Sequence, residues 1–126
     1  MNNEYPLVLV VDDEPDMCWV LKNLLTEQGF EMKIAQTGEA ALSLIESTMF
    51  GIALLDVKLA DIDGLDLAKR IKTKYSSIRI IMISGYYYRD DVNIQRAIEA
   101  GVVSGFISKP FIHQDVVDML RSVEGS

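Results

Sequence analysis

Three short runs of apolar residues constrain the fold of this chain more than any other feature of its sequence. The runs cover Leu7–Val11, Ile52–Leu55 and Ile80–Ile83, and a polar residue follows each of them directly. Unbroken apolar runs of this length are typical of strands that are buried on both faces, as in a parallel sheet. Segments with the spacing of amphipathic helices separate the runs, so the pattern predicts a parallel sheet covered by helices.

Two further segments complete an alternation of strands and helices. Residues 31–35 alternate between apolar and polar side chains, as an edge strand does, and residues 105–108 form a short fifth strand segment. Gly29 and Gly101 are expected to end the first and fourth helices. The helical patterns begin after Asp13, after Thr37, at about Gly64, at about Asp90 and at Ile112.

Five strands that alternate with five helices lead to one arrangement. Right-handed crossovers between parallel strands place helices on both faces of the sheet, and the three fully apolar strands belong at its centre. We therefore expect residues 1–126 to form one doubly wound (βα)5 domain of the α/β class, a three-layer sandwich. Its five-stranded parallel sheet would have the flavodoxin-like strand order 2-1-3-4-5, counted along the chain.

Charge and composition exclude several classes of protein. The chain has a formal net charge of −7, with 12 Lys and Arg against 19 Asp and Glu, so this domain is not expected to bind nucleic acid directly. One cysteine and one histidine permit neither an internal disulfide nor a zinc site. No apolar run reaches the roughly 18 residues of a membrane span, and the N-terminus lacks the basic region of a signal peptide. We expect a cytoplasmic protein without a membrane segment.

Side chains that handle phosphate and divalent metals follow four of the predicted strands. Asp12 and Asp13 follow the first strand, Asp56 the third and Ser84 the fourth, and Lys109 follows the fifth. Because the carboxyl ends of parallel strands meet at one edge of the sheet, these side chains should converge. Clustered carboxylates repel each other and favour a hard cation such as Mg²⁺, and a lysine adds a point charge for phosphate. The set predicts phosphoryl transfer to a carboxylate nucleophile.

Four segments of the sequence resemble the signature segments of the bacterial response-regulator receiver domain, which belongs to the CheY-like superfamily. They read VLVVDDEP, LLDVKLADIDGLDL, IIMISG and GFISKP, in the family's order and at its separations. The resemblance implies that Asp56 is the phosphoacceptor and that Lys109 contacts the phosphoryl group. It implies that Ser84 and Phe106 are the switch residues, and that the Lys109–Pro110 bond is commonly cis. By the same resemblance, Mg²⁺ would be held by Asp12, Asp13, Asp56 and the backbone carbonyl of Lys58.

The resemblance also implies how such a domain would signal. A sensor histidine kinase or a histidine phosphotransfer protein would donate the phosphoryl group, and the domain would catalyse only its own phosphorylation and dephosphorylation. Ser84 would move toward the phosphoryl group and Phe106 would turn inward, remodelling the surface made by the fourth helix, fifth strand and fifth helix. That surface would control an output domain or a separate protein target, and it could also form a homodimer.

The sequence departs from the family pattern at several positions. Ala60 stands where a proline is common, which predicts a more mobile loop, and Phe106 replaces the commoner tyrosine. Lys58 and Tyr86 are expected to flank the path of a water that attacks the phosphoryl group. The run Tyr86–Tyr88 fits either a docking surface or ordinary packing of one ring, and the sequence leaves both interpretations open. We expect Trp19 to be half-buried by packing.

Three other classes of function are disfavoured by particular residues. An aspartate-nucleophile phosphatase would need an acidic group two residues after the nucleophile, where this chain has Lys58. A receiver-like module that is never phosphorylated would not need all five residues at the strand ends. A nucleotide or flavin binder would carry a glycine-rich loop after the first strand, and Asp12 and Asp13 stand there instead.

Overall fold

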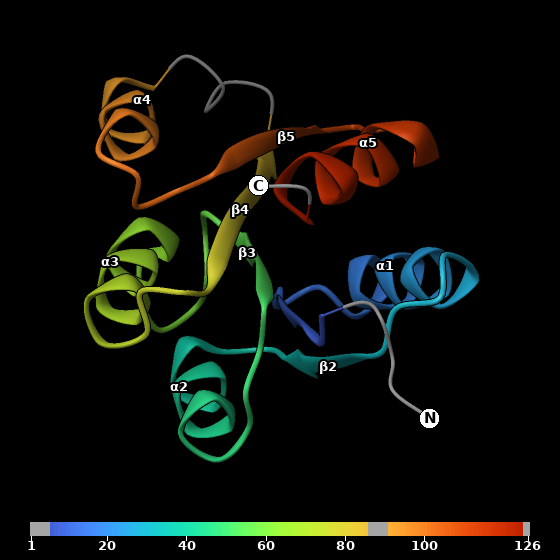
Figure 1. The fold of residues 1–126 in the computed structure, drawn as a ribbon, viewed down its shortest axis with the longest axis horizontal. Coiled ribbons are helices and arrows are strands. Elements are labelled where there is room, and N and C mark those ends of the chain that lie inside the picture. The colour runs from blue at the N-terminus through green and yellow to red at the C-terminus, as the bar shows by residue number, and fades with distance from the viewer. Residues whose placement is uncertain (1–5, 86–90, 125–126) are drawn as a thin grey trace.

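The computed structural model describes residues 6–85 and 91–124, in which five strands alternate with five helices (Figure 1). In chain order they are β1 (Val8–Val11), α1 (Pro15–Glu27), β2 (Met32–Ala35), α2 (Gly38–Ser47), β3 (Ile52–Asp56), α3 (Gly64–Lys74), β4 (Arg79–Gly85), α4 (Val92–Glu99), β5 (Gly105–Lys109) and α5 (His113–Glu124). None of the helices in this described part is long and apolar enough to cross a membrane.

The strands form one parallel sheet in the order β2-β1-β3-β4-β5, which confirms the predicted fold class and strand order. Helices α1 and α5 cover one face of the sheet, and α2, α3 and α4 cover the other (Figure 1). The three strands with unbroken apolar runs are central, and the alternating strand β2 lies at an edge, as expected. The domain is therefore a three-layer sandwich.

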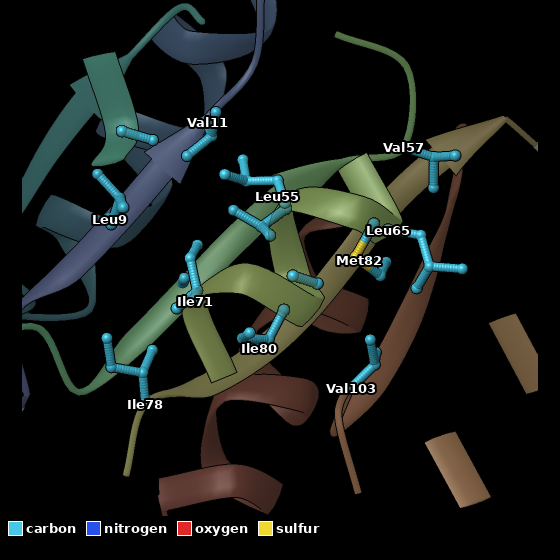
Figure 2. Close-up of a cluster of buried hydrophobic side chains, with 14 of the residues drawn as sticks. Leu9, Val11, Leu55, Val57, Leu65, Ile71, Ile78, Ile80, Met82 and Val103 are labelled. Carbon is cyan, nitrogen blue, oxygen red and sulfur yellow. The ribbon is translucent and has the colours of Figure 1, made fainter. Parts of the chain in front are cut away.

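Both faces of the central strands are buried, which explains why their sequences are apolar at every position. Successive residues of a strand point to opposite faces, so Leu9 and Val11 of β1 contribute to the core beneath α2, α3 and α4, together with Leu55 of β3 (Figure 2). Val8 and Val10 contribute to the second core, which lies beneath α1 and α5. A polar residue inside such a strand would be isolated from water, so polar groups collect at the strand ends.

The ends of α1 and α4 follow the expected glycine signals, but the exposure of Trp19 in α1 differs from the expected one. Gly29 and Gly101 adopt positive φ angles of 91° and 79° just after α1 and α4. Trp19 is 67% exposed, so the prediction that it is half-buried is wrong. Val20 is also exposed, and the buried face of α1 consists of Cys18, Leu21, Leu24 and Leu25.

Two further apolar residues are exposed in the second half of the chain. Val92, the first residue of α4, is 57% exposed, whereas Ile94 and Ala97 form the buried face of that helix. Ile112 precedes α5 and is 67% exposed. The run Tyr86–Tyr88, which the sequence left open between docking and packing, lies outside the described residues.

Candidate functional site

The register of the sheet brings the predicted site residues to one edge. Val11 of β1 pairs with Leu55 of β3, so Asp12 and Asp56 occupy equivalent positions one residue further on. Ser84 of β4 follows the partner of Asp56 by one residue, and Lys109 ends β5. Asp12, Asp56 and Ser84 are buried although they are polar. Buried polar groups at adjacent strand ends indicate a site, since they contribute nothing to the apolar core.

Lys109 reaches the carboxylates of β1 and β3 and thereby ties the two strand ends together. Its Nζ lies 3.3 Å from Asp12 Oδ2 and 3.6 Å from Asp56 Oδ2. It also lies 3.5 Å from Oε1 of Glu14, a residue that the sequence analysis did not assign to the site. The ammonium group is thus shared among three carboxylates. A buried ion pair is weak evidence for stability of the fold, so we interpret this shared charge mainly as a means of orienting the carboxylates.

The pKa values at these strand ends reflect burial and an excess of negative charge. Burial raises the pKa of Asp12, and the hydrogen bond from the Glu14 amide and the charge of Lys109 do not fully offset it. Burial also opposes the charged form of Lys109, but the carboxylates of Asp12 and Asp56 outweigh it and raise the pKa of that ammonium group. One ammonium group therefore faces more negative charge than it can neutralise.

The donor set at this edge fits a hard divalent cation. Carboxylate oxygens of Asp12, Asp13, Glu14 and Asp56 all lie within 4.8 Å of one another. Asp12 and Asp56 are buried, whereas Asp13 and Glu14 are exposed, so the cluster opens toward solvent. Oxygen ligands and access to water are what Mg²⁺ requires, because this ion keeps several of its waters when it binds to proteins. We refer to these four residues as the pocket carboxylates.

Asp13 precedes α1 but does not cap it. The N-cap position is occupied by Glu14, and no side-chain hydrogen bond caps α1 among the residues that the structure describes. Instead, Asp12 Oδ1 accepts a hydrogen bond from the Glu14 amide at 2.9 Å. On the outer side of Asp12, the buried Cys18 thiol donates to the Asp12 backbone carbonyl at 3.3 Å. These contacts hold Asp12 from both its side chain and its backbone.

The loop of residues 57–63 connects the predicted phosphoacceptor to α3. The Lys58 amide donates to Asp56 Oδ1 at 3.3 Å, which places the backbone of Lys58 beside the carboxylate. The Gly64 amide donates to the Val57 carbonyl at 2.7 Å, and Lys58 bridges to Asp63. A Cβ atom at Gly64 would collide with the backbone oxygen of Asp56, so only glycine permits this close return of the chain.

Asp61 in the same loop makes contacts that the sequence did not reveal. Its Oδ1 accepts a hydrogen bond from the Gly38 amide at 2.9 Å, and its Oδ2 accepts one from the Glu39 amide at 3.0 Å. The hydrogen bond from Gly38, followed by that from Glu39, lowers the pKa of Asp61. The partners are 23 and 22 residues away in the chain, so no local pattern could have found them.

The predicted switch residues lie at different distances from the carboxylates. Ser84 is buried in β4 and pairs in register with Ser108 of β5, next to the strand end. Phe106 is half-buried on β5, three residues before Lys109, and lines a groove of about 680 Å³ between β5 and α5. The Lys109–Pro110 peptide bond is cis. The structure therefore places Ser84 at the edge with the pocket carboxylates, and Phe106 deeper along the outer strand.

Comparison with known proteins identifies a family with the same fold. The family model described as "Response regulator receiver domain" matches residues 8–121, which include every predicted site residue. The response regulator TrrA of Thermotoga maritima, solved in complex with Mg(2+)-BeF, is similar over 93% of this chain and 97% of its own. Its TM-score is 0.82 and its sequence is 30% identical.

Curated relatives include proteins of very different length. The transcriptional regulatory protein ZraR of Klebsiella oxytoca is 32% identical over 79% of this chain, and the match covers 21% of ZraR. Sporulation initiation phosphotransferase F of Bacillus subtilis is 29% identical, and the match covers 90% of each chain. The chain thus spans about half or less of the length of several curated relatives that it matches.

Proposed function

Because this chain belongs to the family of response regulator receiver domains, we propose that Asp56 is the residue that accepts the phosphoryl group. The domain is a phosphorylation-activated signalling receiver, a regulatory phosphoacceptor rather than an enzyme that turns over external substrates. The observation that supports Asp56 best is the position of Lys109, whose Nζ lies between the buried carboxylates of Asp12 and Asp56. A buried carboxylate beside a lysine at a sheet edge has the features of a phosphoryl acceptor.

In the proposed reaction, a carboxylate oxygen of Asp56 attacks the phosphorus atom of a phosphohistidine on a partner protein. A P–O bond forms as the P–N bond breaks, and the released imidazole of the donor is protonated. The Lys58 amide holds Asp56 Oδ1 and Lys109 faces Oδ2, so the carboxylate is fixed before the donor arrives. Lys109 then shifts its contact from the carboxylates to a phosphoryl oxygen, where it balances the charge that develops during transfer.

The pocket carboxylates are the candidates for holding Mg²⁺. We assign this role to Asp12, Asp13 and Asp56, together with the backbone carbonyl of Lys58, and the structure adds Glu14 as a further candidate oxygen donor. When bound, the ion would neutralise negative charge on the phosphoryl oxygens and on the carboxylates around them. The pocket alone holds a strong excess of negative charge, which would repel a phosphoryl group that arrived without a cation.

Phosphorylation adds roughly two negative charges at neutral pH next to a set of buried polar groups. We propose that the Ser84 hydroxyl donates to the phosphoryl group and that Phe106 turns inward as the end of β4 shifts. The two arrangements of the α4–β5–α5 surface are in equilibrium, and the phosphoryl group favours one of them because only that one satisfies its oxygens. Loss of the phosphoryl group by self-catalysed hydrolysis would reset the switch.

Several wider assignments complete the proposal. The donor would be a sensor histidine kinase or a histidine phosphotransfer protein, and the α4–β5–α5 surface would control an output domain or a separate protein target. A homodimer through the same surface is a second possibility that the groove between β5 and α5 allows. Residues 1–126 would form a single receiver domain, because all the described strands share one sheet.

The assignment of Asp56 is tested by incubating the Asp56→Asn variant with acetyl phosphate and Mg²⁺. Wild-type protein should gain one phosphoryl group by intact-mass measurement, and hydroxylamine should remove it because an acyl phosphate is the expected product. The Asp56→Asn variant should gain none. The matched control is Asp66→Asn, which removes an exposed carboxylate of α3 and should be phosphorylated like the wild type. Phosphate uptake by Asp56→Asn would move the acceptor to another residue.

A further inference from the structure

Helix α2 is joined to the loop of residues 57–63 by a carboxylate that has no part in the proposed metal site. Both oxygens of Asp61 accept backbone hydrogen bonds from the first turn of α2, at 2.9 Å from Gly38 and 3.0 Å from Glu39. The amides at a helix start carry partial positive charge, so a carboxylate is the side chain best suited to bind two of them. The loop is therefore attached to a helix from another part of the chain.

Packing next to Asp61 makes the attachment specific. A Cβ atom at Gly38 would collide with Cγ2 of Ile62, so the neighbouring loop residue fits directly against the backbone of α2. Gly38 itself is buried, and the two segments together line a pocket that also contains Leu42. A polar contact and an apolar contact thus act at adjacent loop residues, and together they fix both the position and the orientation of this part of the loop.

The other end of the loop meets the phosphoacceptor. Lys58 donates its amide to Asp56 Oδ1, and only Leu59 and Ala60 separate Lys58 from Asp61. A proline at position 60 would fix a φ angle of this loop, whereas Ala60 does not. A displacement of Asp61 would be passed along Leu59 and Ala60 to the Lys58 backbone. The hydrogen bonds to α2 therefore add a restraint on this loop, beside the bridge between Lys58 and Asp63.

We propose that Asp61 is a positioning residue for phosphorylation, which braces the loop of residues 57–63 against α2 and so keeps the Lys58 backbone aligned with Asp56. The inference rests on the proposed function of Asp56 and adds a residue to it. Asp61 touches neither the pocket carboxylates nor Lys109 through any hydrogen bond or ion pair measured in the described residues. The lowered pKa of Asp61 fits this role, because its carboxylate is then charged at neutral pH and can accept hydrogen bonds from both amides.

The test must separate bracing of the loop from simple capping of α2, and the chain offers a matched control. Thr37 caps the same helix by accepting a hydrogen bond from the Ala40 amide at 3.0 Å, and it does not contact the loop through that bond. Both Asp61→Ala and Thr37→Ala remove a cap from α2 and should lower the melting temperature to a similar extent. Only Asp61→Ala removes the brace.

Three measurements compare the two variants. Amide hydrogen exchange at Lys58, measured by NMR without Mg²⁺, should be about tenfold faster in Asp61→Ala and unchanged in Thr37→Ala. Titration with Mg²⁺ alone should show about tenfold weaker binding in Asp61→Ala, a change typical of losing a group that orients a metal ligand, and wild-type binding in Thr37→Ala. The rate of phosphorylation by acetyl phosphate should fall with Mg²⁺ affinity. Asp61→Asn, which keeps one acceptor oxygen, should lie between wild type and Asp61→Ala in all three.

The possible outcomes are distinct. If Lys58 exchange and Mg²⁺ affinity in Asp61→Ala match those in Thr37→Ala, Asp61 only caps α2 and the bracing role is wrong. If wild-type protein takes up no phosphate while Lys58 exchange still rises in Asp61→Ala, the function proposed for Asp56 is wrong and the loop brace stands as a structural fact. Should Asp61→Ala fail to fold, the exchange rate and Mg²⁺ affinity of Asp61→Asn decide the question alone.

Discussion

Two groups of carboxylates lie at the same edge of the sheet, and their surroundings give them opposite roles. The pocket carboxylates lie within 4.8 Å of one another, and Asp12, Glu14 and Asp56 also contact Lys109. Three others, which we call the capping carboxylates, each accept two backbone hydrogen bonds at the start of a helix: Asp61 at α2, Asp63 at α3 and Asp91 at α4. The capping carboxylates are compensated by helix amides and stabilise the fold, whereas the pocket carboxylates keep an excess of charge.

Helix α1 explains how the pocket can hold so many uncompensated carboxylates. Among the described helices, α2, α3 and α4 each begin with an N-cap residue whose side chain accepts a hydrogen bond from the helix. The N-cap residue of α1 makes no such bond. Pro15 stands at its first positions and has no amide proton, so one fewer donor needs a partner. Asp12, Asp13 and Glu14 are therefore not required as caps. The role of an acidic residue at this edge therefore depends on whether the amides of a helix start bind its carboxylate.

The largest expected contrast is the effect of Asp13→Asn. Loss of a pocket carboxylate should weaken Mg²⁺ binding by about 10- to 100-fold, measured by titration with Mg²⁺ and NMR, because this ion depends on charged oxygen ligands. The same change removes repulsion from Asp12 and Asp56, so without Mg²⁺ the variant should unfold at a higher temperature than wild type. Unchanged Mg²⁺ affinity, or lower stability without Mg²⁺, would show that the charge of Asp13 plays no part in the metal site.

Lys109→Met tests the same pocket from the opposite side. Removing the ammonium group leaves Asp12 and Asp56 buried without a countercharge, which should destabilise the Mg²⁺-free protein by about 2 kcal/mol in urea unfolding. Mg²⁺ should bind more tightly than to wild type, since a competing cation is gone, and should restore most of the lost stability. Phosphorylation by acetyl phosphate should nevertheless be slower. If Mg²⁺ restores none of the stability, Lys109 contributes by packing rather than by charge.

The strand ends could be predicted from the sequence because their signals are local. An apolar run that ends at Asp12, Asp56 or Ser84 fixes both the strand and the place of the polar residue, and burial on two faces fixes which strands are central. Glu14 is visible beside Asp12, but whether its side chain caps a helix or turns to Lys109 depends on a rotamer. The contact of Asp61 with α2 depends on the path of a loop, which no periodic pattern encodes.

The exposed apolar residues of α1 and α4 show a second limit of sequence patterns. Cys18 and Val20 are both apolar enough to face a core, and a helix with apolar residues at several adjacent positions can present either one. In the structure Cys18 is buried and its thiol donates a hydrogen bond to the Asp12 carbonyl, whereas Trp19 and Val20 are exposed. Faces of short helices therefore need the packed structure, whereas strand ends do not.

Asp91→Ala provides the pure capping case. Asp91 Oδ1 accepts hydrogen bonds from the Asn93 and Ile94 amides at 2.8 Å and 3.3 Å. Their loss should destabilise the protein by about 1 kcal/mol, the usual cost of removing a helix cap, measured by urea unfolding. Mg²⁺ affinity should stay within twofold of wild type, because Asp91 shares no ligand oxygen with the pocket. A clear loss of Mg²⁺ affinity would show that the two groups of carboxylates are coupled through α4.

The smallest expected effect is the pH dependence of the stability that Asp61 contributes. Hydrogen bonds from the Gly38 and Glu39 amides lower the pKa of Asp61 below its ordinary value of 3.8, so its charged form is favoured in the folded protein. The contribution should be complete above pH 3.8 and should disappear as pH falls through the lowered pKa.

The measured quantity is the difference in unfolding free energy between wild type and Asp61→Asn across this range. Glu39, Glu46 and Arg70 line the same pocket and are present in both proteins. A difference that stays constant as the solution becomes more acidic would mean that Asp61 binds α2 through neutral hydrogen bonds alone, and that its charge plays no part in holding the loop.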